Sequence, residues 1–142
     1  MIAIDTNLLV YAHRSGLAEH RSAQRALQAA SADARGWGIP FPCIAEFWSV
    51  VTHRESAGGG SAPVKARGFL RALVLEAGAK VWMPADGCWE RVTRLAEELG
   101  VRGPRIFDLQ IALTAFDNAA TEIWTHDRGF LAMPGMAVRD PL

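Results

Sequence analysis

The fold is decided by the stretch MIAIDTN, residues 1–7. Its first four residues are apolar, which is typical of a short buried strand. The next three, Asp5, Thr6 and Asn7, are polar residues of the kind that caps a helix. We therefore expect a strand over residues 1–4 and a short helix over Leu8–His13. A buried strand that leads directly into a helix begins a βα unit, and the rest of the chain repeats this order.

Apolar residues at helical spacing predict several further helices. They cover Glu19–Ala32, a segment from Pro42 to about Val51, Pro63–Ala77, Asp86–Leu99 and Ile106–Asn118. Short apolar runs predict strands at Trp37–Ile39, Lys80–Met83 and Glu122–Thr125, with a last edge strand at Met136–Arg139. Strands that alternate with helices indicate a parallel sheet covered on both faces. The fold class is α/β, and Gly58–Ser61 is expected to be a loop inside it.

The helical stripes also predict which side chains form the core. The expected inward faces of five helices are Ala23, Ala26, Leu27 and Ala30; Ile44, Phe47, Trp48 and Val51; Phe69, Leu70, Leu73 and Val74; Trp89, Val92, Leu95, Ala96 and Leu99; Leu109, Leu113 and Phe116. Trp48 and Trp89 lie on these stripes and Trp124 lies within a predicted strand, so the tryptophans are interpreted as core residues.

Length and composition exclude several classes of protein. The 142 residues suit a single domain over 1–142. Fifteen basic and fifteen acidic residues cancel, which argues against binding to nucleic acid through bulk charge alone. Cys43 and Cys88 are too few for a disulfide framework and are expected to be reduced. Without a visible signal peptide or an apolar run of the ~20 residues that span a bilayer, we expect a cytoplasmic protein with no membrane contact.

Acidic residues fall where a parallel sheet binds ligands. In open parallel sheets the ligand lies at the carboxyl ends of the strands. Asp5 directly follows the first predicted strand, and Asp127 follows the strand that ends at Thr125. Glu46 and Asp108 lie in the expected first turns of helices that begin at the same edge. Four carboxylates that are far apart in sequence are therefore predicted to meet at one rim.

Each of these carboxylates also has a simpler interpretation. Asp5 alone is a good helix cap. Glu46 and Asp108 alone suit the positive end of a helix dipole, and Asp127 alone suits a turn before Gly129. Both interpretations remain open for each residue taken singly.

The combination favours a metal site. Carboxylates about 5 Å apart repel by roughly 3 kcal/mol per pair at an effective dielectric near 20, so such a cluster needs a cation. Oxygen ligands favour Mg²⁺ or Mn²⁺ over Zn²⁺, and the four histidines lack zinc-ligand spacing. A divalent ion held by carboxylates binds phosphate oxygens and activates water. This chemistry points to metal-assisted hydrolysis of a phosphodiester.

The acidic residues lie in four segments, which are Ile4-Asp-Thr-Asn7, Ala45-Glu-Phe47, Phe107-Asp-Leu-Gln-Ile-Ala112 and Thr125-His-Asp-Arg-Gly-Phe130. These segments resemble those of the PIN-domain ribonucleases, in particular the VapC-type toxins of toxin–antitoxin pairs. The resemblance runs from the first predicted strand to the last, and its order and spacing both fit. It departs at His126, where a smaller polar residue is common, and in the Gly58–Gly60 loop.

The resemblance implies a three-layer α/β/α sandwich with a mostly parallel central sheet and Mg²⁺- or Mn²⁺-dependent endoribonuclease activity. It assigns metal binding and catalysis to the acidic residues Asp5, Glu46, Asp108 and Asp127. It assigns the orientation of those carboxylates to Thr6, Asn7 and Thr125. The implied partners are an RNA substrate, a cognate VapB-like antitoxin and a second copy of the chain in a homodimer.

Two rival interpretations come from other classes of protein. Phosphatases that form an aspartyl-phosphate place a second Asp two residues after the first, where this chain has Asn7, and a receiver domain needs a late lysine, whereas Lys80 is the last one here. Both are disfavoured. A PIN-like module without catalysis that binds RNA or protein is the remaining alternative, and the intact acidic set argues against it. Five arginines near the expected rim are interpreted as solvated charges rather than RNA contacts: Arg14, Arg54, Arg102, Arg105 and Arg128.

Overall fold

A computed structural model describes residues 1–56 and 59–142 and contains a five-stranded sheet in the order β3-β2-β1-β4-β5. Every pair of neighbouring strands is parallel. The strands are β1 (Ile2–Ile4), β2 (Trp37–Pro40), β3 (Lys80–Trp82), β4 (Glu122–Trp124) and β5 (Ala137–Arg139). The predicted α/β class is confirmed, and Met136–Arg139 does contribute the edge strand β5.

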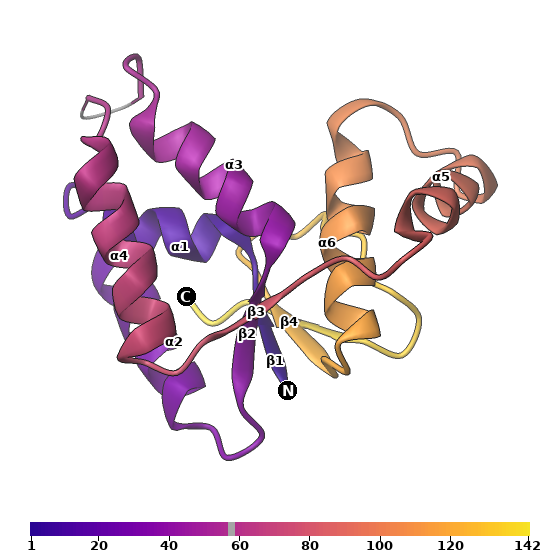
Figure 1. Ribbon diagram of the computed structural model, residues 1–142, viewed down its shortest axis with the longest axis horizontal. Helices are drawn as coiled ribbons and strands as arrows, with labels where there is room; N and C mark the ends of the chain where they lie inside the picture. Colours follow the sequence, from indigo (N-terminus) through magenta and orange to yellow (C-terminus); the bar gives the residue numbers. More distant parts are fainter. Residues whose placement is uncertain (57–58) are drawn as a thin grey trace.

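Helices flank this sheet on both sides (Figure 1). They are α1 (Thr6–His13), α2 (His20–Ala32), α3 (Phe41–Thr52), α4 (Pro63–Leu75), α5 (Cys88–Glu98) and α6 (Ile106–Asp117), with a short 3₁₀ turn, η1 (Gly103–Arg105), before α6. In Figure 1, α1, α2 and α4 lie on one side of the sheet, and α6 lies on the other with α5 outside it. The three-layer sandwich that the sequence predicts is therefore present.

The central strand β1 positions the site. All three of its residues are completely buried, because β2 and β4 pair with it on both sides and helices cover both faces. The chain order of the strands reverses at β1, since β2 and β3 lie on one side of it and β4 and β5 on the other. A crevice at such a reversal is where open α/β sheets bind ligands, outside the carboxyl ends of the strands. Asp5 and Thr125 stand at that point, directly after β1 and β4.

Some of the predicted inward faces are wrong. Helix α5 buries Cys88, Val92 and Ala96, so its inward face is rotated from the predicted stripe and leaves Trp89 and Leu99 exposed. The reason is that α5 packs on α6 rather than on the sheet and buries only a narrow strip. Phe116 on α6 and Trp48 on α3 are also exposed, whereas Trp37, Trp82 and Trp124 are buried as expected.

Part of the predicted loop, Gly58, lies outside the described residues, and the described Gly60 and Ser61 belong to no helix or strand. The longest described helices, α2 and α4, have 13 residues each. Among the described residues, no helix combines the length and the apolar character needed to cross a membrane.

Gly38 in β2 is expected to be essential for packing. A Cβ atom at this position would lie 2.5 Å from Cε2 of the buried Trp82 ring, closer than real Cβ atoms come to any neighbour. We expect Gly38→Ala to lower the free energy of unfolding by about 1–3 kcal/mol, as overpacked cores do. Urea unfolding followed by tryptophan fluorescence measures this change.

The matched control is Gly68→Ala in the middle of α4, where an added Cβ meets nothing within 4 Å. This change should stabilise the fold by about 0.5–1 kcal/mol, because glycine is unfavourable inside a helix. Equal unfolding midpoints for the two variants would contradict the packing argument.

Candidate active site

Asp5 has two structural functions at once. Its Oδ1 accepts a hydrogen bond of 2.7 Å from the backbone N–H of Thr6, so the residue caps α1 as the simpler interpretation predicts. Its Oδ2 accepts hydrogen bonds from Asn7 Nδ2 at 2.8 Å and from Thr125 Oγ1 at 2.6 Å. The side chain is thus held from α1 and from the end of β4, and the residue is only 6% exposed.

Thr125 is the centre of this polar network. Its hydroxyl donates to Asp5 and accepts hydrogen bonds from Asn7 Nδ2 at 2.8 Å and from the backbone N–H of Asp127 at 3.0 Å. Asn7 also accepts a hydrogen bond of 3.1 Å from the backbone N–H of His126 on its Oδ1. The network joins the start of α1 to the segment after β4, and it fixes one rotamer for each of these side chains.

Glu46 approaches the same place from α3. Because α3 begins at Phe41, Glu46 lies in its second turn, and the predicted position in the first turn is wrong. Thr6 Oγ1 donates a hydrogen bond of 2.6 Å to Glu46 Oε2 and so directs this carboxylate toward α1. Thr6 and Glu46 are 40 residues apart in sequence, and only the fold brings them together.

The other two predicted carboxylates come from α6, which carries Asp108, and from the segment after β4, which carries Asp127. Asp108 is in the first turn of α6, as predicted, and it is half-buried. Asp127 is exposed, and its Oδ1 accepts a hydrogen bond of 2.8 Å from the backbone N–H of Gly129, which is the turn geometry of the simpler interpretation. Its negative charge nonetheless adds to the rise in the pKa of Asp108 that burial causes.

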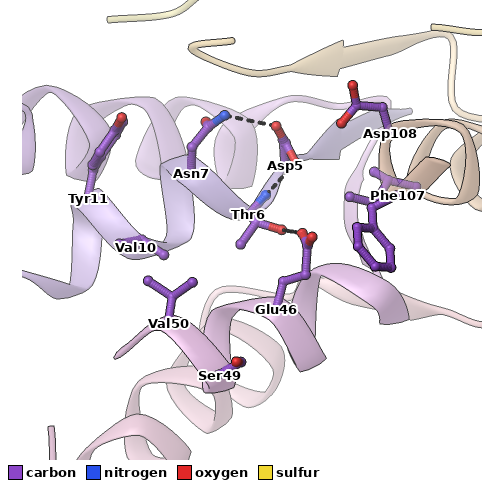
Figure 2. A pocket seen from close by; sticks show the side chains of 11 residues that line it. Asp5, Thr6, Asn7, Val10, Tyr11, Glu46, Ser49, Val50, Phe107 and Asp108 are labelled. Atoms are coloured by element: carbon purple, nitrogen blue, oxygen red, sulfur yellow. Dashed lines mark hydrogen bonds between the residues drawn. The ribbon is translucent and has the colours of Figure 1, made fainter. Parts of the chain in front are cut away.

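Most of these residues line one cavity, which has a volume of about 610 Å³. Figure 2 shows that Asp5, Glu46 and Asp108 line it from the cap of α1, from α3 and from α6. Thr6 and Asn7 line it too, whereas Asp127 and Thr125 are absent from its lining. Across residues 1–56 and 59–142, no three His, Cys, Asp or Glu side chains stand in the arrangement of a preformed metal site.

Two of the carboxyl groups that line the cavity have a raised pKa. Burial raises the pKa of Asp5 to about 6, and the neighbouring Glu46 and Asp108 add to this increase, while the hydrogen bonds from Thr125 and Thr6 oppose it. Burial, followed by the charge of Asp127, raises the pKa of Asp108, and Arg105 opposes this. No ion pair between described residues includes Asp5, Glu46, Asp108 or Asp127. The carboxylates therefore repel one another in a place where a cation would be stabilised.

Aliphatic and aromatic side chains that were not predicted from the sequence complete the cavity. They are Val10, Tyr11, Val50, Phe107 and Ile111. Helical spacing was an available signal, because Val10, Tyr11 and Val50 each follow a polar cavity residue, Thr6, Asn7 and Glu46, by four positions. Residues at this spacing share one face of a helix.

His126 has a partner of its own. Its Nδ1 lies 2.9 Å from Asp140 Oδ2, so this residue is tied to the segment after β5 and is not part of the cavity lining.

The chain is similar over nearly its whole length to proteins of a known family. The sequence pattern of the PIN domain family matches residues 2–136 of the chain. The VapC ribonuclease Mb2897 of Mycobacterium bovis is 32% identical over 142 residues, which is 100% of this chain and 96% of that protein. Ribonuclease VapC48 of Mycobacterium tuberculosis is 25% identical over 137 residues, covering 96% of this chain and 94% of that one.

Solved structures share the fold at lower sequence identity. VapC20 of Mycobacterium tuberculosis, a toxin that cleaves the sarcin–ricin loop, superposes with a TM-score of 0.69 at 17% identity and covers 92% of both chains. FitAcB of Neisseria gonorrhoeae superposes with a TM-score of 0.63 at 18% identity, over 99% of this chain and 98% of that one. VapBC2 of Rickettsia felis, bound to a DNA fragment from its promoter, has a TM-score of 0.60 at 18% identity and covers 98% of both chains.

Proposed function

Because this chain belongs to the PIN domain family and is similar over its whole length to VapC ribonucleases, we propose that it is a metal-dependent endoribonuclease, the toxin of a VapBC-type pair. The observation that carries this proposal is the cavity in which Asp5, Glu46 and Asp108 meet without a basic partner among the described ion pairs. A cavity lined by carboxylates repels an RNA phosphate unless a cation lies between them.

The residues present fit a divalent cation. PIN nucleases are typically metal-dependent, and here the donors are carboxylate oxygens, which suit Mg²⁺ and are equally suited to Mn²⁺. We assign Asp5, Glu46, Asp108 and Asp127 as the residues that would hold the ion. When bound, such an ion supplies Lewis-acid activation of water and neutralises charge on the phosphate.

The chain's own residues prepare this chemistry. Thr125 and Asn7 hold Oδ2 of Asp5 in place, the backbone N–H of Thr6 holds its Oδ1, and the Thr6 hydroxyl holds one oxygen of Glu46. Such outer hydrogen bonds fix the geometry of ligating carboxylates. Burial of Asp5 against the end of β1 keeps water away from one side of the cavity, so electrostatic attraction there is stronger than at an open surface.

Partners follow from the same relationship. Solved relatives include the VapBC2 and FitAcB proteins, and we propose a VapB-like antitoxin as the protein partner and RNA as the substrate. We also propose that residues 1–142 act as one PIN domain, that the chain forms a homodimer and that it works in the cytoplasm. Sedimentation equilibrium, with and without the co-expressed antitoxin, measures the mass of each assembly.

The direct test uses cleavage and stability together. We expect the purified chain to cut single-stranded RNA in Mg²⁺ or Mn²⁺ and to stop cutting in EDTA. The same ions should raise the free energy of unfolding by about 2.7 kcal/mol at a hundred times the dissociation constant, because they bind only the folded cavity. Thermal unfolding at a series of ion concentrations measures this shift. A chain that is stabilised by the ions but leaves RNA intact would instead be the binding module without catalysis.

A further inference from the structure

Phe107 presents an apolar ring at the mouth of the carboxylate cavity. It is 49% exposed, although it lies directly before Asp108 in the first turn of α6. Figure 2 shows its ring on the side of the cavity where Glu46 lies, while the Asp108 side chain extends the other way from α6. An exposed aromatic ring next to the candidate ligands is available to a bound molecule and adds little to the core.

The same ring lines a second cavity. This cavity has a volume of about 420 Å³ and lies between α5 and α6, where its lining includes Trp89, Val92, Ile106 and Phe107. Trp89 is the most exposed tryptophan among the described residues, at 73%. Phe107 belongs to both cavities, so an apolar surface continues from the carboxylates over Phe107 to Trp89. We call these two residues the aromatic track.

We propose that the aromatic track binds unpaired nucleobases of the RNA substrate beside the phosphate that is cut. This inference rests on the proposed function, which places a phosphate next to Asp108. A nucleotide whose phosphate lies there carries its base toward the adjoining surface, and on the α6 side that surface is the Phe107 ring. Aromatic side chains stack on the bases of single strands, whose faces are open, whereas the bases of a duplex are already stacked on each other.

The surroundings of the track favour RNA over an apolar protein segment. Arg105 lies in η1 directly before α6, three positions before Asp108. One of its nitrogens donates to the backbone oxygen of Gly129, which holds the side chain at the rim and leaves further donors for a phosphate. A positive group and an exposed aromatic ring close to Asp108 in the chain are the two elements that bind single-stranded nucleic acid.

The test measures RNA affinity separately from cleavage. Fluorescence anisotropy of a labelled single-stranded RNA of about ten nucleotides, a length within the usual site sizes, is recorded in Ca²⁺, with a gel to check that the RNA stays intact. We expect Phe107→Ala to weaken binding about tenfold, Trp89→Ala to weaken it less, and Phe107→Trp to retain it. The matched control is Phe116→Ala, because Phe116 lies on the same helix, is 45% exposed and lines neither cavity.

Four results would overturn the aromatic track. The first three are no measurable RNA binding by the wild type, equal affinities for Phe107→Ala and Phe116→Ala, and equal affinities for the RNA and a version without bases at its central positions. Dissociation of a dimer by Phe107→Ala, seen by size-exclusion chromatography with unchanged RNA affinity, would also overturn it and make the surface a contact between copies. If RNA binds through Phe107 but is not cut in Mg²⁺ or Mn²⁺, the proposed function fails while the base contact stands.

Discussion

An Asp5→Asn variant should lose at least about a hundredfold in the rate of RNA cleavage while keeping its fold. Loss of an outer partner of a metal ligand already costs about 10–100-fold, and loss of a ligand's charge should cost at least as much. The amide keeps nearly the shape of the carboxylate, so α1 remains capped through the Oδ1 that accepts from Thr6. Initial rates on single-stranded RNA in saturating Mg²⁺ measure the loss.

Stability and a control separate this effect from misfolding. The amide is not charged, so it avoids the burial cost that raises the pKa of Asp5, but its NH₂ group faces the donors of Asn7 and Thr125. These two effects oppose each other, and we expect similar melting temperatures without metal. Asp86→Asn makes the same chemical change at an exposed position outside the cavity and should leave cleavage unchanged. An Asp5→Asn variant that cleaves like Asp86→Asn would reject the assignment.

Thr125→Val is expected to reduce cleavage about 10–100-fold, although Thr125 does not line the cavity. The valine keeps the volume of threonine but removes the hydroxyl that donates to Asp5 and accepts from Asn7 and from the N–H of Asp127. Since that hydroxyl lowers the pKa of Asp5, its removal disfavours the charged carboxylate further. The buried groups that lose a partner should also lower the free energy of unfolding by about 1–3 kcal/mol.

The measurement for Thr125→Val is a pair of titrations, of cleavage rate and of melting temperature, against Mg²⁺. A weaker apparent affinity for the ion should accompany the lower rate. Thr52→Val is the matched control, because the Thr52 hydroxyl donates to the backbone carbonyl of Trp48 in its own helix and Thr52 lines neither cavity. If the two valine variants bind Mg²⁺ equally well, Thr125 does not orient Asp5 for ion binding.

Local sequence patterns predicted most of the fold for a clear physical reason. A completely buried strand such as β1 must be apolar throughout, and a cap such as Asp5 must offer an oxygen to a free N–H, so both leave a mark on adjacent residues. The order of strands and helices then restricts the sheet to a parallel one. The α/β class and the elements around Asp5 and Asp108 follow from such neighbours alone.

Helix faces were harder to predict because apolar residues are not all buried. Trp89, Leu99 and Phe116 extend apolar stripes in the sequence, yet the structure exposes them. Which part of a wide stripe is buried depends on the neighbouring element, and α5 has only α6 to pack against. The exposed Trp89 and Phe107 are therefore available to a ligand, which no pattern within α5 or α6 indicates.

By itself, the sequence determined the fold class, the capping role of Asp5 and the set of acidic residues that follow strands or begin helices. Only the tertiary structure decided that Asp5, Glu46 and Asp108 share one cavity, that Asp127 is not part of its lining and that Thr125 joins Asp5 to Asn7. The physical reason is the separation in sequence between the residues that interact. Caps and periodic stripes depend on residues a few positions apart, whereas the Thr6–Glu46 and Asp5–Thr125 hydrogen bonds connect residues 40 and 120 positions apart. Contacts of that kind exist only once the sheet has brought the carboxyl ends of its strands together.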